Sequence, residues 1–145
     1  MGMVDISDKQ ITKRLAVASG KIIFSAKAFK IFLKQGSPKG NVLETARVAG
    51  IMAAKNTPSL IPLCHPLKLE KASVTFEALK SKKTVKVIAE IACSGKTGVE
   101  MEALAAVCAA CLTIYDMMKF SGQDMSITEI QLMHKSGGKS RVYQR

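Results

Sequence analysis

The stretch that decides the fold is GKTGVEMEALAAVCAACLTIYDMMKF, residues 95 to 120. Its middle, residues 103–115, carries no charge over thirteen positions, so the helix it predicts is apolar on every side and belongs inside a core. Thr97 and Glu100 have the spacing of a capping box, in which each side chain bonds the backbone amide of the other. Gly122 supplies a left-handed stop just past the end. Because the uncharged run is shorter than the roughly 20 apolar residues of a membrane helix, we expect a core helix.

Acidic residues stand at both ends of this predicted helix. Glu102 lies near its start and Asp116 near its end, 14 residues on. At about 1.5 Å per residue, the two carboxylates are roughly 21 Å apart along the axis and cannot form one catalytic pair within one chain. If both serve chemistry, they belong to separate sites or to one site assembled from two subunits. Asp116 and Lys119 lie three residues apart and share a face of the helix.

Length and composition limit the class of protein. The 145 residues are the usual size of one domain, so we expect a single domain over residues 1–145 whose core needs no disulfide or metal. Twenty-two Lys and Arg against eleven Asp and Glu give a net charge of +11, which favours polyanions such as nucleotides, nucleic acids or anionic lipids. The start shows no secretory or transit pattern, and Ile6 stands where myristoylation needs Ser or Thr. We therefore expect a cytoplasmic protein.

Hydrophobic periodicity predicts the other elements. In chain order they are a strand over 11–24, helices over 25–34 and 42–56, strands over 74–78 and 85–91 forming an antiparallel hairpin, the long helix, and a last strand over 125–133. This order predicts an α+β fold, ferredoxin-like, with an antiparallel sheet of about four strands packed on helices. A polar tail follows from Lys135, and most such tails are solvated.

Several charged residues could carry chemistry, and each also has an ordinary structural explanation. Lys96 precedes the long helix, whose N-terminal amides and dipole stabilise an anion, but it could equally be solvated. Glu100 and Glu102 would favour the same helix end without a further role. The helix C-terminus and apolar neighbours raise the pKa of Asp116, while Lys119 lowers it. Such competition suits a general acid or base, but an ordinary surface pair has the same pattern.

Two further segments are candidates because of their backbone. Pro62 and Pro66 bracket residues 63–65 and restrict that loop to a few shapes, which would suit a site. A packed loop histidine remains the plainer explanation of His65. The lysines and glycines of residues 135–139 could fold a flexible strip over a phosphate.

Several common motifs fail. Residues 95–97, GKT, do not form a phosphate-binding loop, because the glycine required five positions earlier is Glu90. The C-x-x-C of residues 108–111 lies mid-helix among alanines, so we expect buried thiols rather than a metal or redox site. Cys64 and His65 are adjacent, and neighbours on an extended chain point apart, which makes a poor nucleophile–base pair.

Four motifs occur in a fixed order: LIPLCHPL at 60–67, KTGVEMEAL at 96–104, LTIYDMMK at 112–119 and KSGGKS at 135–140, preceded by MVDIS at 3–7 and KGNVLETARVAGIMAAK at 39–55. Together they closely resemble the cyclic pyranopterin monophosphate synthases, the C proteins of molybdenum cofactor biosynthesis. The resemblance runs from Met3 to about Ser140.

The resemblance implies a fold, an assembly and a reaction. The fold is a ferredoxin-like α+β domain in a homohexamer, a trimer of dimers, with active sites between subunits, which would answer the separation of Glu102 and Asp116. The activity is that of a lyase that converts (8S)-3',8-cyclo-7,8-dihydroguanosine 5'-triphosphate to cyclic pyranopterin monophosphate with release of pyrophosphate. The implied partners are this triphosphate and further copies of the chain, without nucleic acid or membrane. No tightly bound cofactor or metal is implied, although Mg²⁺ could accompany the triphosphate.

The resemblance also implies site residues. Its catalytic residues match Asp116, Lys119 and Lys135. Its substrate-binding residues match Leu63, Cys64, His65, Met101, Glu102, Lys39 and Arg14, and we expect Glu100 beside them to bind substrate as well. We expect Asp116 to move protons and the two catalytic lysines to stabilise negative charge or donate a proton. We expect Lys39, Arg14 and also Lys96 to hold the triphosphate. Before Lys39 the chain carries Ser37 and Pro38, where more polar or histidine residues are expected in relatives.

Two other classes of function compete with this one. A basic sheet protein could bind RNA, but aromatic residues are only 5% of the chain, Trp is absent, and no strand has the aromatic spacing of an RNA-recognition motif. A purely structural oligomer would leave the basic residues near Asp116 without a role.

Overall fold

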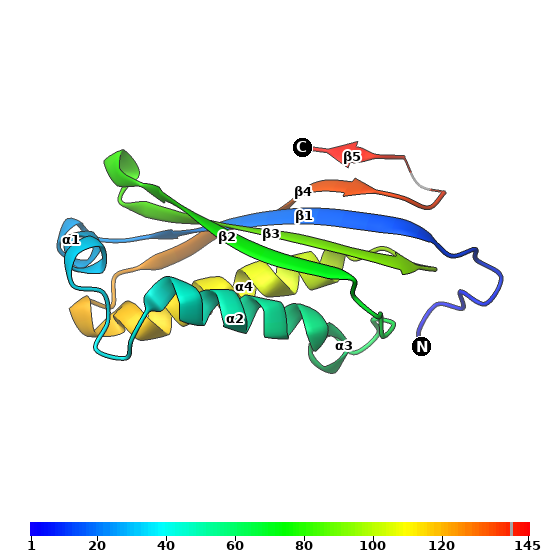
Figure 1. The fold of residues 1–145 in the computed structure, drawn as a ribbon, viewed down its shortest axis with the longest axis horizontal. Helices are drawn as coiled ribbons and strands as arrows, with labels where there is room; N and C mark the ends of the chain where they lie inside the picture. Colours follow the sequence, from blue (N-terminus) through cyan, green and yellow to red (C-terminus); the bar gives the residue numbers. More distant parts are fainter. Residues whose placement is uncertain (140) are drawn as a thin grey trace.

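Five antiparallel strands form one sheet, and the two longest helices lie against one of its faces (Figure 1). This computed structural model describes residues 1–139 and 141–145. In chain order the elements are β1 (Thr12–Ile23), α1 (Ala26–Lys34), α2 (Val42–Lys55), α3 (Thr57–Leu60), β2 (Lys71–Leu79), the 3-10 turn η1 (Lys80–Lys82), β3 (Thr84–Gly95), α4 (Glu100–Met118), the 3-10 turn η2 (Lys119–Ser121), β4 (Ser126–Ser136) and β5 (Tyr143–Gln144).

The strand order identifies the fold. The sheet runs β2-β3-β1-β4-β5, and α2 and α4 provide the two helical connections of a βαββαβ unit. This arrangement is ferredoxin-like, and the predicted α+β fold is confirmed. The prediction omitted the short helix α3 and the two-residue strand β5. Residues His134 and Lys135 of β4 pair with β5, so part of the tail expected to be solvated belongs to the sheet edge.

The core lies between the sheet and the two long helices. On β3 the alternate residues Val85, Val87, Ala89 and Ile91 are at most 1% exposed, as expected for a strand with one buried face. Three alanines of α4, Ala103, Ala106 and Ala110, are fully buried and allow close packing.

Two glycines set how closely the layers approach. A Cβ on Gly20 of β1 would lie 2.6 Å from Cγ1 of Val107 on α4. A Cβ on Gly50 of α2 would lie 2.9 Å from the carbonyl oxygen of Ala106. Glycine at these positions therefore lets α4 rest directly on the sheet and on α2.

The helix α4 is a core helix, as predicted. By length and composition alone, Glu100–Ser121 could cross a membrane, which the shorter uncharged run did not suggest. Nine of the 19 residues of α4 are buried, however, against the sheet and α2. A soluble core helix accounts for this pattern.

The predicted ends of this helix were wrong. The predicted capping box places the start of the helix at Thr97, but Gly95 ends β3 and the helix begins at Glu100. Val99 is the N-cap and makes no side-chain capping bond, so there is no capping box. Glu100 cannot reach back as predicted, because it is itself the first helical residue. Gly122 does not have the predicted αL conformation, because its φ of 150° and ψ of 154° lie in another positive-φ region that glycine alone readily adopts, and the helix has already passed into η2.

The last strand is longer and less regular than predicted. β4 continues to Ser136, and its register with β1 shifts twice, between Val17 and Ala18 and between Ser19 and Lys21. Such irregularities explain why the isoleucines of this strand are imperfectly phased in the sequence. The longer strand also brings Lys135 opposite Ala16 of β1.

Replacing Gly50 by alanine tests the close packing of α2 on α4. We expect Gly50→Ala to destabilise the fold by about 1–3 kcal/mol, although alanine favours a helix interior by about 1 kcal/mol. The added methyl group would meet the Ala106 carbonyl, which is backbone and cannot move aside. Urea unfolding measures the change. Val48→Ala on the same helix, 60% exposed, is the control and should stay within about 0.5 kcal/mol. Equal stability of the two variants would contradict the close approach.

Candidate functional site

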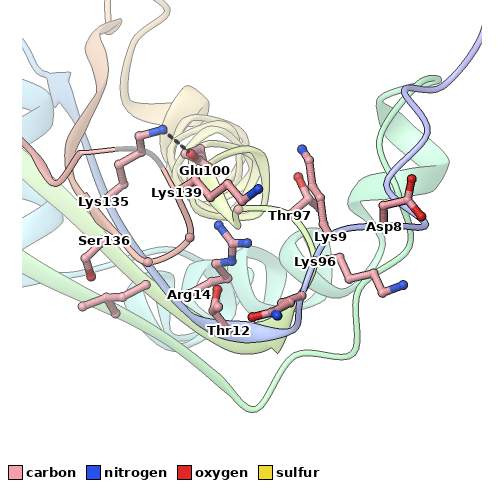
Figure 2. Close-up of a pocket in the computed structure, with 15 residues that line it drawn as sticks. Asp8, Lys9, Thr12, Arg14, Lys96, Thr97, Glu100, Lys135, Ser136 and Lys139 are labelled. Atoms are coloured by element: carbon pink, nitrogen blue, oxygen red, sulfur yellow. Dashed lines mark ion pairs between the residues drawn. The ribbon is translucent and has the colours of Figure 1, made fainter.

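A basic cleft lies at the N-terminal end of α4 (Figure 2). Its volume is about 570 Å³. The five basic residues that line it come from the N-terminal segment, β1, the loop before α4, β4 and the tail, and they are Lys9, Arg14, Lys96, Lys135 and Lys139. Figure 2 shows these side chains around Glu100 and Thr97. We call the cavity that these residues line the basic cleft.

Backbone contacts hold two of its cations in place. Arg14 on β1 donates from Nε to the carbonyl oxygen of Gly95, at 3.2 Å. Lys96 donates from Nζ to the carbonyl oxygen of Ser7, at 2.7 Å, which ties the N-terminal segment to the cleft. Lys135 on β4 places its Nζ 3.1 Å from Oε1 of Glu100. The cleft therefore combines several ammonium and guanidinium groups with a single partly buried ion pair.

The tail forms one wall of the basic cleft. A Cβ on Gly138 would fall inside the guanidinium group of Arg14, and the φ of +75° at this residue also favours glycine. At the neighbouring Gly137, where φ is +102°, a Cβ would lie 2.0 Å from the backbone carbonyl oxygen of Lys13, so the tail can lie against β1 only because that residue is glycine. Residues 135–139, predicted as a flexible strip, thus have a defined place beside β1. Ser140, the last residue of the KSGGKS motif, lies outside the described residues.

A smaller cleft adjoins the basic one. It has about 170 Å³ and shares Thr97, Gly98 and Glu100 with its neighbour. Six residues predicted to bind substrate line it together, and they are Leu63, Cys64, His65, Glu100, Met101 and Glu102. The N-terminal segment reaches this cleft as well, because Nε2 of His65 is 2.8 Å from the carbonyl oxygen of Val4.

Glu102 is a buried carboxyl group in this smaller cleft. The residue is 3% exposed. Burial raises its pKa, and the charge of Glu100 adds to that, against a lowering by its own backbone amide. Burial, with the charge of Glu102, also raises the pKa of the Cys64 thiol. Cys64 is therefore a poor nucleophile, in agreement with the sequence argument.

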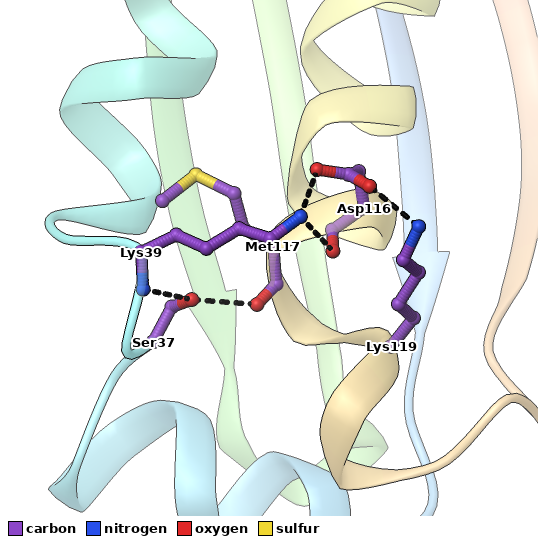
Figure 3. Close-up of polar contacts among 5 residues, drawn as sticks. All are labelled: Ser37, Lys39, Asp116, Met117 and Lys119. Atoms are coloured by element: carbon purple, nitrogen blue, oxygen red, sulfur yellow. Dashed lines mark hydrogen bonds and ion pairs between the residues drawn. The ribbon is translucent and has the colours of Figure 1, made fainter.

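A second group of charged residues lies at the other end of α4 (Figure 3). Asp116 accepts from two lysines, with Nζ of Lys39 2.6 Å from Oδ2 and Nζ of Lys119 2.8 Å from Oδ1. Lys39 comes from the loop between α1 and α2, and Lys119 begins η2. All three side chains are about half exposed. We call them the Asp116 cluster.

The two lysines decide the charge of Asp116. The hydrogen bond from Lys119, followed by that from Lys39, lowers the pKa of Asp116 to about 2. The same pairing raises the pKa of Lys119. Of the opposing effects predicted for the pKa of Asp116, the lowering by the lysines is the larger, and Asp116 is a carboxylate at neutral pH.

One chain brings together only part of the predicted site. The start of α4 brings together Arg14, Lys135, Glu100 and the segments 63–65 and 101–102. The Asp116 cluster lies at the other end of the helix. Glu102 and Asp116 remain roughly 21 Å apart along the helix axis. The three predicted catalytic residues are therefore divided between the two groups.

Sequence reasoning missed several residues of the basic cleft, among them Lys9, Thr12, Thr97 and Ser136. Thr12 is notable because its buried Oγ1 has no hydrogen-bond partner among the described residues. Lys9 and Thr12 belong to no motif that points to a ligand. Only the pairing of β1 with β3 and β4 brings them to the start of α4.

Neither the cysteines nor the acidic residues suggest a metal centre. Cys111 is buried, and burial, with the neighbouring Cys108, raises its pKa to about 12, as expected for an inert core thiol. Among residues 1–139 and 141–145, no three His, Cys, Asp or Glu side chains are grouped as metal ligands. The prediction about Mg²⁺ is not tested by this geometry.

The sequence matches a known family over almost its whole length. The model of the MoaC family matches residues 3–138. The chain belongs to the MoaC family. A relative from Desulfatibacillum aliphaticivorans is 51% identical over 138 residues, which cover 95% of this chain and 87% of that protein. Relatives from Parvibaculum lavamentivorans and Campylobacter lari are each 50% identical and cover 97% and 99% of this chain, and 88% and 91% of their own lengths. All three are named cyclic pyranopterin monophosphate synthase. The MoaC match includes the Asp116 cluster and every basic residue of the cleft except Lys139.

The buried carboxyl of Glu102 predicts a pH-dependent stability change. Its folded pKa is raised, so stability falls as pH rises from the unfolded pKa, about 4.3, through the folded pKa. We expect Glu102→Gln to raise the melting temperature at about pH 8 and to have little effect at about pH 4. Thermal unfolding at both pH values measures this. The control is Glu77→Gln on β2, an exposed position where both effects should be small. An equal gain at the two pH values would show that burial of charge is not the cause.

Proposed function

We propose that this chain is a cyclic pyranopterin monophosphate synthase of molybdenum cofactor biosynthesis. It would convert (8S)-3',8-cyclo-7,8-dihydroguanosine 5'-triphosphate to cyclic pyranopterin monophosphate and release pyrophosphate. The observation that carries the proposal is the junction of the two clefts. Five cations surround the larger one, and the segments implied for substrate binding line the smaller one beside it.

The basic cleft suits the triphosphate. Its five basic residues face only Asp8 and Glu100 as acidic neighbours in the lining, so the cleft keeps an excess of positive charge. Arg14 offers a planar fork for a phosphate, and the lysines offer compact charges. The smaller cleft, with His65 and Glu102, would then receive the ring system. Any Mg²⁺ would enter with the phosphates, which supply the oxygen ligands that it prefers.

We further propose that the complete site needs two subunits. Two copies of α4 packed antiparallel about a twofold axis would bring the start of one helix beside the end of the other. The basic cleft of one chain would then meet the Asp116 cluster of its partner, twice per dimer. Apolar side chains on α4 support this contact, since Met101 is 37% exposed and Leu112 is 61% exposed. Three such dimers would form the hexamer, and the enzyme would be cytoplasmic.

The charges at the Asp116 cluster support particular roles. A carboxylate with a pKa of about 2 is ionised at neutral pH and is a weak base, so Asp116 would take up a proton only from a strongly acidic group and would otherwise act through its negative charge. Lys119, whose pKa is raised, stays charged and would stabilise negative charge that develops on the substrate. Lys39 would share that task, and Lys135 would act from the opposite subunit.

The arrangement of aromatic residues gives no support to RNA binding. Phe24, Phe29 and Phe32 pack on one another, with ring centroids 5.4 to 6.0 Å apart. Phe76 packs against the core and lies under the guanidinium of Arg47. These rings serve packing and leave no stacking platform among them.

Removing the charge of Asp116 tests the activity. Given the cyclised triphosphate, the purified chain should release pyrophosphate and form the pterin product. We expect Asp116→Asn to reduce turnover by about 10²–10⁴-fold while the protein stays folded. Asp124→Asn, an exposed carboxylate just beyond the helix, is the matched control and should keep wild-type turnover. A near-normal rate in Asp116→Asn would reject its role, and no turnover by the folded wild type would reject the function.

Mixing two inactive variants tests the shared site. Asp116→Asn and Lys135→Ala are co-expressed with different tags, and hexamers that carry both tags are purified. About half of the dimers within these hexamers should be mixed, and one of the two sites in each mixed dimer is intact. The mixture should therefore recover about a quarter of wild-type turnover. Each variant alone should stay inactive. If all catalytic residues came from one chain, the mixture would be as inactive as its components.

A further inference from the structure

The loop that carries Lys39 is docked on the C-terminal end of α4 (Figure 3). Residues 37–40 form a tight turn, in which the amide of Gly40 donates to the carbonyl oxygen of Ser37 at 3.0 Å. Pro38 occupies the second position of this turn, where its fixed φ is favourable. Lys39 therefore starts from a rigid backbone.

The hydroxyl group of Ser37 joins the backbone of this turn to the helix. Oγ of Ser37 donates to the carbonyl oxygen of Met117 at 2.7 Å and accepts from the backbone amide of Lys39 at 3.2 Å. Met117 is near the end of α4, where the last carbonyls have no partner within the helix. Ser37 satisfies one of these carbonyls and fixes the turn in the same contact.

The ion pair between Lys39 and Asp116 cannot fix the loop by itself. Both side chains are about half exposed, and such pairs contribute roughly 0–1 kcal/mol. Lys39 also donates weakly to the carbonyl oxygen of Asp116, at 3.4 Å. The strongest geometric constraint on the lysine is therefore the position of its backbone, which Ser37 sets.

We infer that Ser37 is a positioning residue, whose hydroxyl holds the Lys39 turn on α4 and so places the Lys39 ammonium against Asp116. The inference rests on the proposed function for its catalytic consequence. Ser37 touches no reacting atom and acts only through Lys39. The assignment adds a residue that neither the motifs nor the resemblance pointed to.

The test compares Ser37→Ala with Ser121→Ala. The hydroxyl of Ser121 donates to the next carbonyl of the same helix end, that of Met118, at 2.7 Å, so both variants lose one hydroxyl–carbonyl bond. We expect Ser37→Ala to lower kcat about 10–100-fold, as small displacements of a catalytic group do, and Ser121→Ala to stay within about threefold. The melting temperature should fall somewhat more in Ser37→Ala, which also loses the bond accepted from the Lys39 amide, and both variants should stay folded at the assay temperature. Ser37→Thr, which keeps a hydroxyl, should restore most of the activity.

A second measurement does not depend on turnover. NMR titration of the Asp116 carboxyl should give a pKa closer to the ordinary value in Ser37→Ala than in Ser121→Ala, because a displaced Lys39 no longer donates to it. An unchanged Asp116 titration in Ser37→Ala would overturn the inference, as would equal loss of kcat in the two alanine variants. If the wild type has no synthase activity, the proposed function fails, and the titration still decides whether Ser37 positions Lys39.

Discussion

The close packing of α4 against the sheet and α2 is the constraint on which the rest of the structure depends. Gly20 and Gly50 have no side chain, which lets α4 approach the sheet and α2 closely, and the buried alanines of α4 pack in the contact. A helix held in this way is rigid along its length, about 28 Å for 19 residues. Polar groups at its two ends are therefore held at a fixed separation. The division of the candidate site into two groups is a consequence of the core.

The charged residues around this helix contribute more to the binding of an anion than to the stability of the fold. Lys135 pairs with Glu100, and Lys39 and Lys119 pair with Asp116, through side chains that are from about a third to about half exposed. Pairs of this kind contribute little to folding. The remaining cations of the basic cleft have too few acidic neighbours to balance them. The fold therefore relies on apolar burial, and the positive charge stays available to a bound anion.

Local patterns in the sequence predicted most of the fold and the residue types of the site. Alternation located β3, and an uncharged run located α4. The same patterns failed where tertiary contacts decide the outcome. The capping box was wrong because the chain bends at Lys96 and Thr97 and the helix begins only at Glu100, whose carboxylate meets Lys135 on a distant strand. The pairing of β5 with β4 depends on a fold that is already formed. Likewise, Lys39 lies 77 residues from Asp116, so the sequence around the helix shows only one of its two lysines.

The charge states of Asp116 and Lys119 determine how this end of α4 could contribute to catalysis. With Asp116 ionised and Lys119 held in its charged form, neither group is tuned toward neutral pH in the free chain. Catalysis by such groups depends on where their charges stand relative to the substrate, since their protonation is already settled. Position is a property of the backbone that carries a side chain. For Lys119 that backbone is the end of a core helix, and for Lys39 it is a four-residue turn joined to that helix by the hydroxyl of Ser37.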